Sequence, residues 1–266
     1  MEGTENKKTK LSFGDSLGQF SYSNGRKRKI ETQDLKVEKV KHEEEQQEVS
    51  PPSLPSPKRS KNKGYAPPEK YAHLKPLKPL LKPGLRCVFI GFNPGTTTAL
   101  KGHYYAHHSN AFWKMIYQSG CVDRKVTYED DQNLPDEYRI GFTDLVERPT
   151  SGISELSVQE MNESVPSLEH RIATNGPHMI CIIGKGIWET IYKTKNKRPL
   201  PKGFKLGYQE NTEFGGCNNV FVLPSTSGLV AGIPQKEKIR LWNEVGNFLN
   251  THFPLNQLYT ETSTTN

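Results

Sequence analysis

Three short, predominantly apolar stretches constrain the fold of this chain more than any other feature. They lie at residues 87–90, 179–183 and 219–223, and each ends at a glycine or a proline. Continuous apolar stretches of this length are typical of strands that are buried on both faces, as in parallel sheets covered by helices. They predict an α/β fold, a three-layer α/β/α sandwich around a short central, mainly parallel sheet.

The segments between these strands favour helices, because their apolar residues recur with helical spacing. Ser157 and Glu160 fit a capping box, and we expect Pro166 to break or kink the helix that follows. The alternation of strands and helices is what a parallel sheet requires. Further helices are predicted over residues 111–119, 187–193 and 235–250.

The positive charge of the chain is confined to its N-terminal part. Residues 1–82 hold 18 basic and 11 acidic side chains, an excess of seven that equals the net charge of all 266 residues. In this part 20 of the 82 residues are apolar, against 33% of the whole chain. Such a segment buries too little apolar surface to offset the entropy of ordering it, so we expect a disordered basic tail.

We therefore expect one domain over residues 83–252, followed by a disordered C-terminal tail over residues 253–266. Two basic clusters in the N-terminal tail, at residues 26–29 and 58–63, are typical of nuclear import signals or nucleic-acid contacts. A merely solvated tail is the alternative. On the first interpretation the protein is nuclear.

Several classes of protein do not fit the sequence. No stretch approaches the roughly 18 apolar residues that span a bilayer, and the N-terminus lacks the apolar segment of a secretory signal. We expect a soluble intracellular protein without a membrane partner. Its four cysteines are far apart and form no CxxC pair, so we expect reduced structural thiols.

Two loops are the candidates for a ligand site, because ligands of such sheets bind beyond the carboxyl ends of the strands. They are residues 91–98 after the first strand and 224–232 after the last. Glycine and proline in the first loop let main chain approach a ligand, and Asn93 offers an amide donor and a carbonyl acceptor. Asn-Pro-Gly is also ordinary turn chemistry, so this loop by itself fits a plain turn equally well.

Five separated motifs follow one another along the domain, at residues 91–95 (Gly-Phe-Asn-Pro-Gly), 101–105, 110–114, 141–150 and 223–228. In this order they resemble the mismatch-specific uracil/thymine-DNA glycosylases of the uracil-DNA glycosylase superfamily, over residues 85–250. The resemblance implies a monofunctional DNA glycosylase of base-excision repair. Such an enzyme flips uracil, and in many relatives mismatched thymine or other altered bases, out of duplex DNA and hydrolyses the N-glycosidic bond.

The resemblance also assigns roles at the reacting centre. Asn93 matches the family's catalytic asparagine, which orients a water molecule but is a poor base, so we expect a slow enzyme. Main-chain N–H groups around Phe92 and Gly95 would stabilise the departing base. Tyr105 matches the aromatic residue that stacks on the flipped base, with a core or surface tyrosine as the alternative.

Other matching positions concern the pocket wall and the DNA backbone. Thr98 lines the pyrimidine edge or is a plain loop threonine, and Asn110 forms the pocket wall, caps a helix, or does both. Ser225 and Ser227 would bind flanking phosphates. Gly228 and Leu229 match the segment that enters the base stack, unless Leu229 packs in the core. Val230 and Ala231 follow where certain relatives have an arginine that contacts the orphaned guanine, so the preference for the opposite base stays open.

We expect no metal and no cofactor, since His103, His107 and His108 lack cysteine or carboxylate partners at ligand spacing and are expected at the surface or in the pocket lining. The expected partners are double-stranded DNA that contains uracil or mismatched bases and, downstream, enzymes that repair abasic sites; the protein itself is expected to be a monomer. Two alternatives stay open: a catalytically silent DNA-binding protein of the same fold, and an α/β hydrolase acting on nucleosides.

Overall fold

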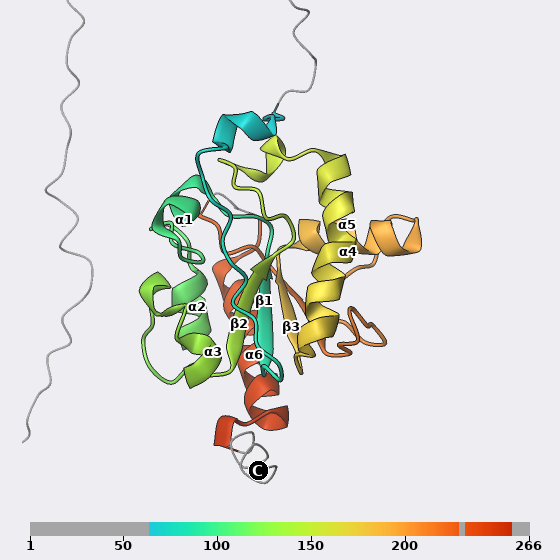
Figure 1. Ribbon diagram of the computed structural model, residues 1–266. Helices are drawn as coiled ribbons and strands as arrows, with labels where there is room; N and C mark the ends of the chain where they lie inside the picture. Colours follow the sequence, from blue (N-terminus) through green and yellow to red (C-terminus); the bar gives the residue numbers. More distant parts are fainter. Residues whose placement is uncertain (1–63, 229–231, 257–266) are drawn as a thin grey trace, which may run out of the picture. The chain divides into compact units, whose positions relative to one another are not determined.

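The computed structural model describes residues 64–228 and 232–256, which are built around a five-stranded sheet (Figure 1). The strands are β1 (Cys87–Gly91), β2 (Ile140–Asp144), β3 (Ile180–Ile183), β4 (Gly207–Tyr208) and β5 (Val220–Leu223). Their order in the sheet is β2-β1-β3-β5-β4. All neighbours are parallel except β4, which is antiparallel to β5. The predicted short, mainly parallel sheet is thus confirmed.

Helices cover both faces of this sheet. They are α1 (Thr96–Lys101), α2 (Phe112–Gln118), α3 (Leu134–Glu137), α4 (Val158–Asn175), α5 (Lys185–Asn196) and α6 (Gln235–His252), with 3-10 turns η1 (Pro68–Tyr71), η2 (Tyr128–Asp130) and η3 (Ile153–Glu155). Successive strand residues point to opposite faces. Accordingly Phe89 of β1 packs with α2 and α6, and its neighbour Ile90 packs with α4 and α5. This confirms the three-layer α/β/α architecture.

Two strands were not expected from the sequence. β2 is as buried as its neighbours, but Gly141, Thr143 and Asp144 interrupt its apolar character. β4 has only two residues, too few for a pattern. β1 and β2 pair in register from Cys87 with Ile140 to Gly91 with Asp144, so the two strands end together at one edge of the sheet.

Pro166 does not break its helix, so this part of the prediction is wrong. α4 continues through Pro166 for 18 residues. A proline inside a helix removes one backbone hydrogen bond. Here the buried face formed by Val165, Leu168 and Ile172 packs on the sheet on both sides of the proline, which compensates for that loss.

Residues 64–82 belong to the folded domain, which corrects the boundary placed at residue 83. Tyr71, Leu74 and Leu77 are buried, while the residues between them are exposed. Leu80 exchanges two backbone hydrogen bonds with Phe142 of β2, at 2.9 and 3.0 Å. Few apolar residues suffice in this segment because they recur at every third position and all three face the core. The remainder of the expected tail, residues 1–63, lies outside the described residues.

The folded domain also extends beyond residue 252. Arg86 is buried, and it donates to the carbonyl oxygen of Phe253 at 2.6 Å and to Oδ1 of Asn250 at 2.8 Å. Leu255 packs against the core. These contacts place residues 253–256 in the domain, whereas residues 257–266 of the expected C-terminal tail lie outside the described part.

The four cysteines are free and buried, as expected of structural thiols. In the described part of the chain, no helix is long and apolar enough to cross a membrane.

Candidate active site

The loops that follow β1 and β2 are joined by backbone hydrogen bonds at the carboxyl edge of the sheet. The N–H of Leu145 donates to the carbonyl oxygen of Gly91 at 2.9 Å, and the N–H of Thr150 donates to that of Pro94 at 3.1 Å. The pairing of the strands is thereby continued into the loops. As a result the motif at residues 91–95 lies beside the motif at residues 141–150, which the sequence alone did not show.

Asn93 is held between these two loops by its amide nitrogen. Nδ2 donates to the carbonyl oxygen of Arg148 at 2.9 Å and to Oγ1 of Thr150 at 2.8 Å. The Thr150 hydroxyl in turn donates to the carbonyl oxygen of Gly152 at 2.9 Å. Because both amide hydrogens are engaged, the orientation of the amide is fixed, and Oδ1 is the atom left to accept a hydrogen bond.

Arg148, which supplies one of these acceptors, is itself fixed by an ion pair. Its guanidinium donates to both carboxylate oxygens of Glu160 at 2.6 and 2.8 Å. These bonds lower the pKa of the Glu160 carboxyl. The predicted capping box is therefore only half formed: Ser157 Oγ accepts from the Glu160 N–H at 3.0 Å, but the Glu160 side chain binds Arg148 rather than returning to Ser157.

The main chain of the same loop presents unused donors. The backbone N–H groups of Phe92, Asn93 and Gly95 donate to no backbone carbonyl oxygen of the described residues. Gly95 immediately precedes α1, and a Cβ at this position would meet nothing within 4 Å. Open space and free N–H groups at one loop are what an anionic or carbonyl-bearing ligand requires.

Tyr105 and Asp144 lie next to each other beside Gly91. A Cβ on Gly91 would lie 2.1 Å from Oδ1 of Asp144 and 3.2 Å from the hydroxyl of Tyr105. That hydroxyl is buried without a hydrogen-bond partner among the described residues. Burial raises the pKa of Asp144 to about 7, against the opposing effect of the Arg171 charge. The carboxyl therefore titrates close to neutral pH.

The ring of Tyr105 stacks on Phe112, with centroids 4.0 Å apart and planes 10° apart. Its backbone is left-handed, with φ of 53°, a conformation that a bulky residue adopts at a cost. Asp131 fixes the preceding residue, because its carboxylate accepts from the Tyr104 N–H at 2.7 Å. Tyr105 is half-buried: its ring packs on Phe112 of the core, and it lies beside the loops that follow β1 and β2.

The loop after β5 packs against the segment that precedes α2. The Ala111 N–H donates to the carbonyl oxygen of Thr226 at 2.9 Å. A Cβ on Gly228 would lie 2.8 to 2.9 Å from atoms of Ser109, so only glycine allows this close approach. Ser225 and Ser227 are half-buried on the same loop, with the Ser227 N–H donating to Ser225 Oγ at 3.3 Å. Leu229, the expected wedge, lies outside the described residues.

The remaining predicted residues are less informative. Thr98 is buried in α1. Asn110 Oδ1 accepts from the N–H of Phe112 at 3.0 Å, but the N-cap residue of α2 is Ala111 and not Asn110. His103 donates through Nδ1 to the buried carboxylate of Asp131 at 2.8 Å. No group of His, Cys, Asp and Glu able to hold a metal is found among the described residues.

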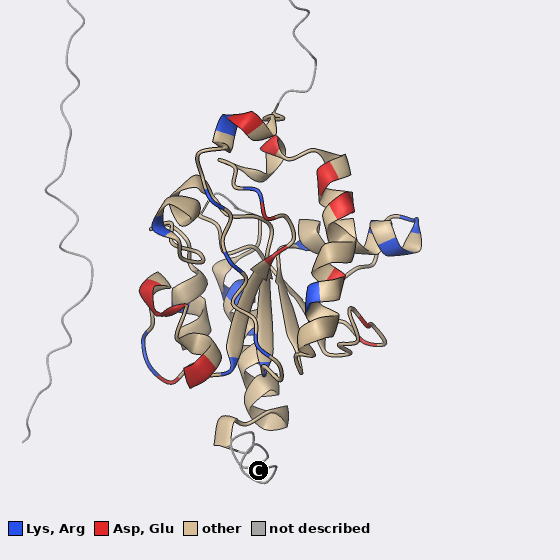
Figure 2. Cartoon of the chain, viewed as in Figure 1, with Lys and Arg blue, Asp and Glu red and all other residues tan. Residues whose placement is uncertain are grey.

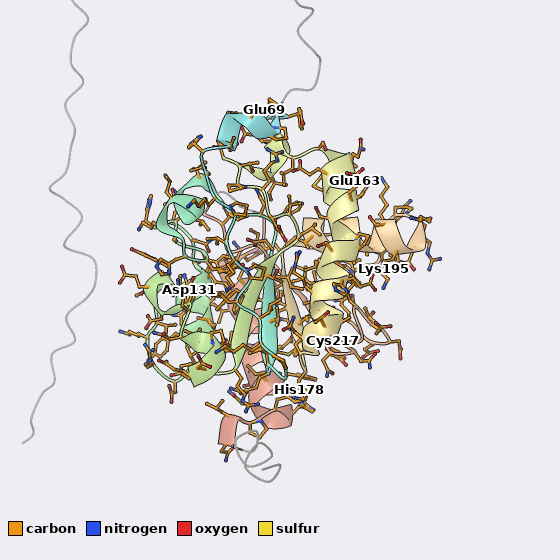
Figure 3. The ribbon with its side chains drawn as sticks, viewed as in Figure 1. Glu69, Asp131, Glu163, His178, Lys195 and Cys217 are labelled. Carbon is orange, nitrogen blue, oxygen red and sulfur yellow. The ribbon has the colours of Figure 1, made fainter. Side chains whose placement is uncertain are left out.

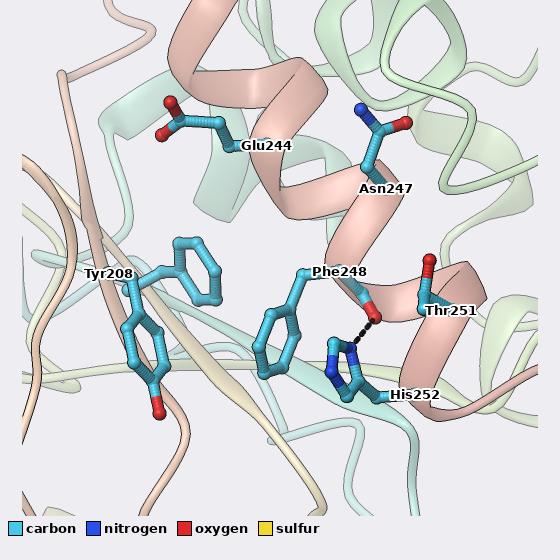
Figure 4. A pocket seen from close by; sticks show the side chains of 7 residues that line it. Tyr208, Glu244, Asn247, Phe248, Thr251 and His252 are labelled. Atoms are coloured by element: carbon cyan, nitrogen blue, oxygen red, sulfur yellow. Dashed lines mark hydrogen bonds between the residues drawn. The ribbon is translucent and has the colours of Figure 1, made fainter.

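A separate surface hollow of about 410 Å³ lies between β4 and α6 (Figure 4). Its aromatic side chains include Tyr208 and Phe248, and the His252 ring donates to the Phe248 carbonyl oxygen at 3.0 Å. Glu244 at its rim is paired with Arg240. None of the residues predicted for the site lines this hollow, so the loop cluster at the carboxyl edge is the better candidate.

Sequence reasoning found Asn93 and the loops but missed the residues that hold them. Thr150 and Arg148 lie within a quoted motif, yet nothing in their spacing pairs them with Asn93. Asp144 ends a strand that was not predicted. The two motifs belong to the ends of adjacent strands, but only the register of β1 and β2 establishes this.

The chain is similar to known proteins over this domain. A family model described as "Uracil DNA glycosylase superfamily" matches residues 79–246. A "G/U mismatch-specific uracil DNA glycosylase" of Schizosaccharomyces pombe is 39% identical over 168 residues, which are 62% of this chain and 51% of the relative. The chain thus spans about half the length of that curated relative.

One similar solved structure is a solution NMR structure from Methanosarcina acetivorans, described as a candidate uracil DNA glycosylase. It is 19% identical, covers 66% of this chain and 98% of its own, and has a TM-score of 0.42. At that level it supports no argument.

Proposed function

We infer the function of this chain from its family, because it belongs to the uracil DNA glycosylase superfamily. We propose that it is a monofunctional DNA glycosylase that removes uracil from duplex DNA in base-excision repair. The yeast relative is named for G/U mismatches. We therefore propose uracil opposite guanine as the first substrate, with mismatched thymine or other altered bases as further ones.

The observation that carries this proposal is the fixed amide of Asn93. Its two N–H groups are held by Arg148 and Thr150, which leaves Oδ1 as an acceptor of known orientation. A carbonyl oxygen so placed would accept a hydrogen bond from water and aim the water's lone pair at the sugar. Because an amide is a poor proton acceptor, Asn93 would orient the water rather than deprotonate it.

Hydrolysis then depends on the departing base. The water oxygen forms a bond to C1′, the bond from C1′ to N1 of uracil breaks, and its electron pair leaves with the base; the proton released by the water passes to solvent or to the base. The negative charge that develops on uracil would be stabilised by the free N–H groups of Phe92, Asn93 and Gly95. Preorganised donors of this kind act most strongly in the transition state.

The target base lies inside a duplex and must be flipped out first. Tyr105 would offer its ring to the flipped base, with Thr98 and Asn110 at the pocket wall. Leu229 would fill the space left in the stack, and Ser225 and Ser227 would contact flanking phosphates. The close packing of Gly228 on Ser109 supports this assignment, since it ties the inserting loop to the segment that bears Tyr105.

We also propose that the protein acts in the nucleus as a monomer and hands its product to enzymes that repair abasic sites. The nuclear location is supported by the pair of basic clusters at residues 26–29 and 58–63. The test is the location of a fluorescent fusion with and without substitutions in the two clusters.

The activity is tested by single-turnover assays on duplexes with a central G·U, A·U or G·T pair and on single-stranded uracil DNA, read as alkali-labile abasic sites. Asn93→Ala should slow excision by about 100-fold or more, since it removes the group that orients the water. Asn243→Ala is the matched control, because Asn243 is exposed on α6.

Each outcome is decisive. Equal rates for Asn93→Ala and the wild type would contradict the role of Asn93. Tight binding of uracil DNA by the wild type with no abasic product would favour the catalytically silent alternative. Release of uracil from free deoxyuridine but not from DNA would favour the nucleoside hydrolase.

A further inference from the structure

A run of basic residues covers the end of α5 and the loop after it. Residues 193–205 contain six basic side chains and no acidic one. Residues 83–266 as a whole hold 18 of each sign, so the rest of that region has an acidic excess of six. We call residues 193–205 the basic segment. Its charged members are Lys193, Lys195, Lys197, Arg198, Lys202 and Lys205.

Most of these charges are not used within the domain. Lys195 pairs with Glu169 of α4, and the guanidinium of Arg198 lies 5.9 Å from the centre of the Tyr192 ring. Lys193, Lys197, Lys202 and Lys205 are exposed and make no ion pair with any residue in the described part of the chain. Figure 2 shows blue without red on the projecting end of α5, and Figure 3 labels Lys195 there, on the far side of the sheet from Asp131.

The basic segment also has a recess. A hollow of about 300 Å³ is lined by Lys193, Lys197, Thr194 and Asn162. The Thr194 hydroxyl donates to Asn162 Oδ1 at 3.2 Å, so the amide nitrogen of Asn162 keeps its hydrogens for another acceptor. Two ammonium groups and an amide donor around one hollow suit an anion with several acceptor oxygens, such as a phosphate.

α5 connects the basic segment to the candidate active site. A Cβ on Gly186, in its first turn, would lie 3.6 Å from the Phe92 ring, and one on Gly184 would lie 3.9 Å from Ser225. Lys185 Nζ lies 6.0 Å from the centre of the Phe204 ring, so the loop after α5 returns past its beginning. The 12 residues of α5 span about 18 Å; Lys185 at its start pairs with Glu189 at 3.1 Å, and the unpaired Lys193 and Lys197 lie at its far end.

We propose that the basic segment is a second DNA-binding surface, which holds backbone phosphates of the duplex on one side of the flipped nucleotide. This proposal rests on the proposed function. A length of about 18 Å corresponds to roughly five base pairs, so the segment would engage DNA about half a helical turn from the lesion. The continuity with the site favours duplex DNA over an acidic protein as the partner.

The test compares Lys193→Gln/Lys197→Gln with Lys114→Gln/Lys125→Gln, a control that removes two exposed lysines from α2 and the loop after it, on the other face of the sheet. Binding is measured on two duplexes with uracil near one end. In one of them the long flank lies on the 5′ side of the uracil, and in the other it lies on the 3′ side. On one of them Lys193→Gln/Lys197→Gln should lose affinity. The slope of log K against log[salt] should become less steep by about 0.9 per lost phosphate contact. For two lost contacts, the loss of affinity between 50 and 200 mM salt should be roughly tenfold smaller than in the wild type. Its excision rate at saturating protein should equal that of the wild type.

Several results would overturn the proposal. They are unchanged affinity and salt dependence on both duplexes, equal losses on both, or the same loss in the control variant. Loss of binding to a polyglutamate peptide with unchanged DNA binding would replace DNA by an acidic protein as the partner. A wild type that produces no abasic sites contradicts the proposed function instead, whatever the variants do.

Discussion

The candidate active site and the basic segment use polar groups in opposite ways. At the site the candidate catalytic side chain is held by a series of polar groups: Thr150 and Arg148 fix Asn93, and Glu160 fixes Arg148. In the basic segment four lysines are exposed and unpaired with any described residue. A side chain in a fixed orientation contributes to catalysis by positioning the reactants, whereas exposed charges attract a ligand by their sum. A single substitution should therefore matter far more at the site than in the basic segment.

The largest effect is expected where the site is most tightly packed. Gly91→Ala would place a Cβ 2.1 Å from Asp144 Oδ1. We expect a loss of about 3 kcal/mol in the free energy of unfolding, since neither the strand nor the buried carboxyl can move freely. Denaturant unfolding measures it. Gly95→Ala, in the same loop but with open space around it, is the control and should be close to neutral; equal losses for both would show that the packing at Gly91 is loose.

The next effect concerns the buried carboxyl. The pKa of Asp144 in the folded chain is about 7, above its ordinary value, so the folded state keeps a proton that the unfolded state has lost. Its contribution to stability is complete below about pH 4 and is lost as the pH rises through 7, at up to about 1.4 kcal/mol per pH unit. Asp144→Asn should remove this dependence.

The measurement is the unfolding midpoint of both forms from pH 5 to pH 8. The midpoint of Asp144→Asn should rise relative to the wild type with increasing pH. Glu163→Gln, which changes an exposed carboxyl on α4, should follow the wild type. Parallel curves for Asp144→Asn and the wild type would mean that Asp144 is already ionised in the folded protein at pH 5.

A smaller effect should follow from releasing the amide of Asn93. Thr150→Val keeps the shape of the side chain but removes the hydroxyl that accepts from Nδ2. The substitution also removes the bond from this hydroxyl to the Gly152 carbonyl oxygen. Loss of the bond that holds the amide, about 1 kcal/mol, predicts a single-turnover rate roughly five- to tenfold lower with little change in DNA affinity. Thr212→Val, at an exposed hydroxyl, is the control. An unchanged rate would show that Arg148 alone suffices to hold the amide.

The smallest effect on catalysis is expected from truncation. Residues 1–63 hold 14 basic and 10 acidic side chains. Their removal should flatten the salt dependence of binding to undamaged DNA and leave the excision rate and the melting temperature unchanged. Removal of residues 1–82 should also lower the melting temperature, because it takes Tyr71, Leu74 and Leu77 out of the core. Equal melting temperatures for the two truncations would contradict the corrected boundary.

The sequence predicted the parts of the fold that local chemistry determines. Continuous apolar stretches identified β1, β3 and β5, and the strand ends placed Asn93 at the ligand edge. It did not reveal β2, whose Gly141 is buried for a tertiary reason: Leu80 and Leu85 lie where its Cβ would be. The partners of Asn93 were hidden for the same reason. They come from a loop that meets Asn93 only after β2 has paired with β1.

The strand pairing of Leu80 with β2 has a consequence for the protein in concentrated solution. β2 is the last strand on its side of the sheet, and its outer edge would present free N–H and C=O groups to other molecules. Leu80 occupies that edge at Phe142 through both of its backbone groups. Edge strands without such cover are templates for intermolecular strand addition. We therefore expect the segment before the first strand to oppose self-association at this edge, besides contributing to the core.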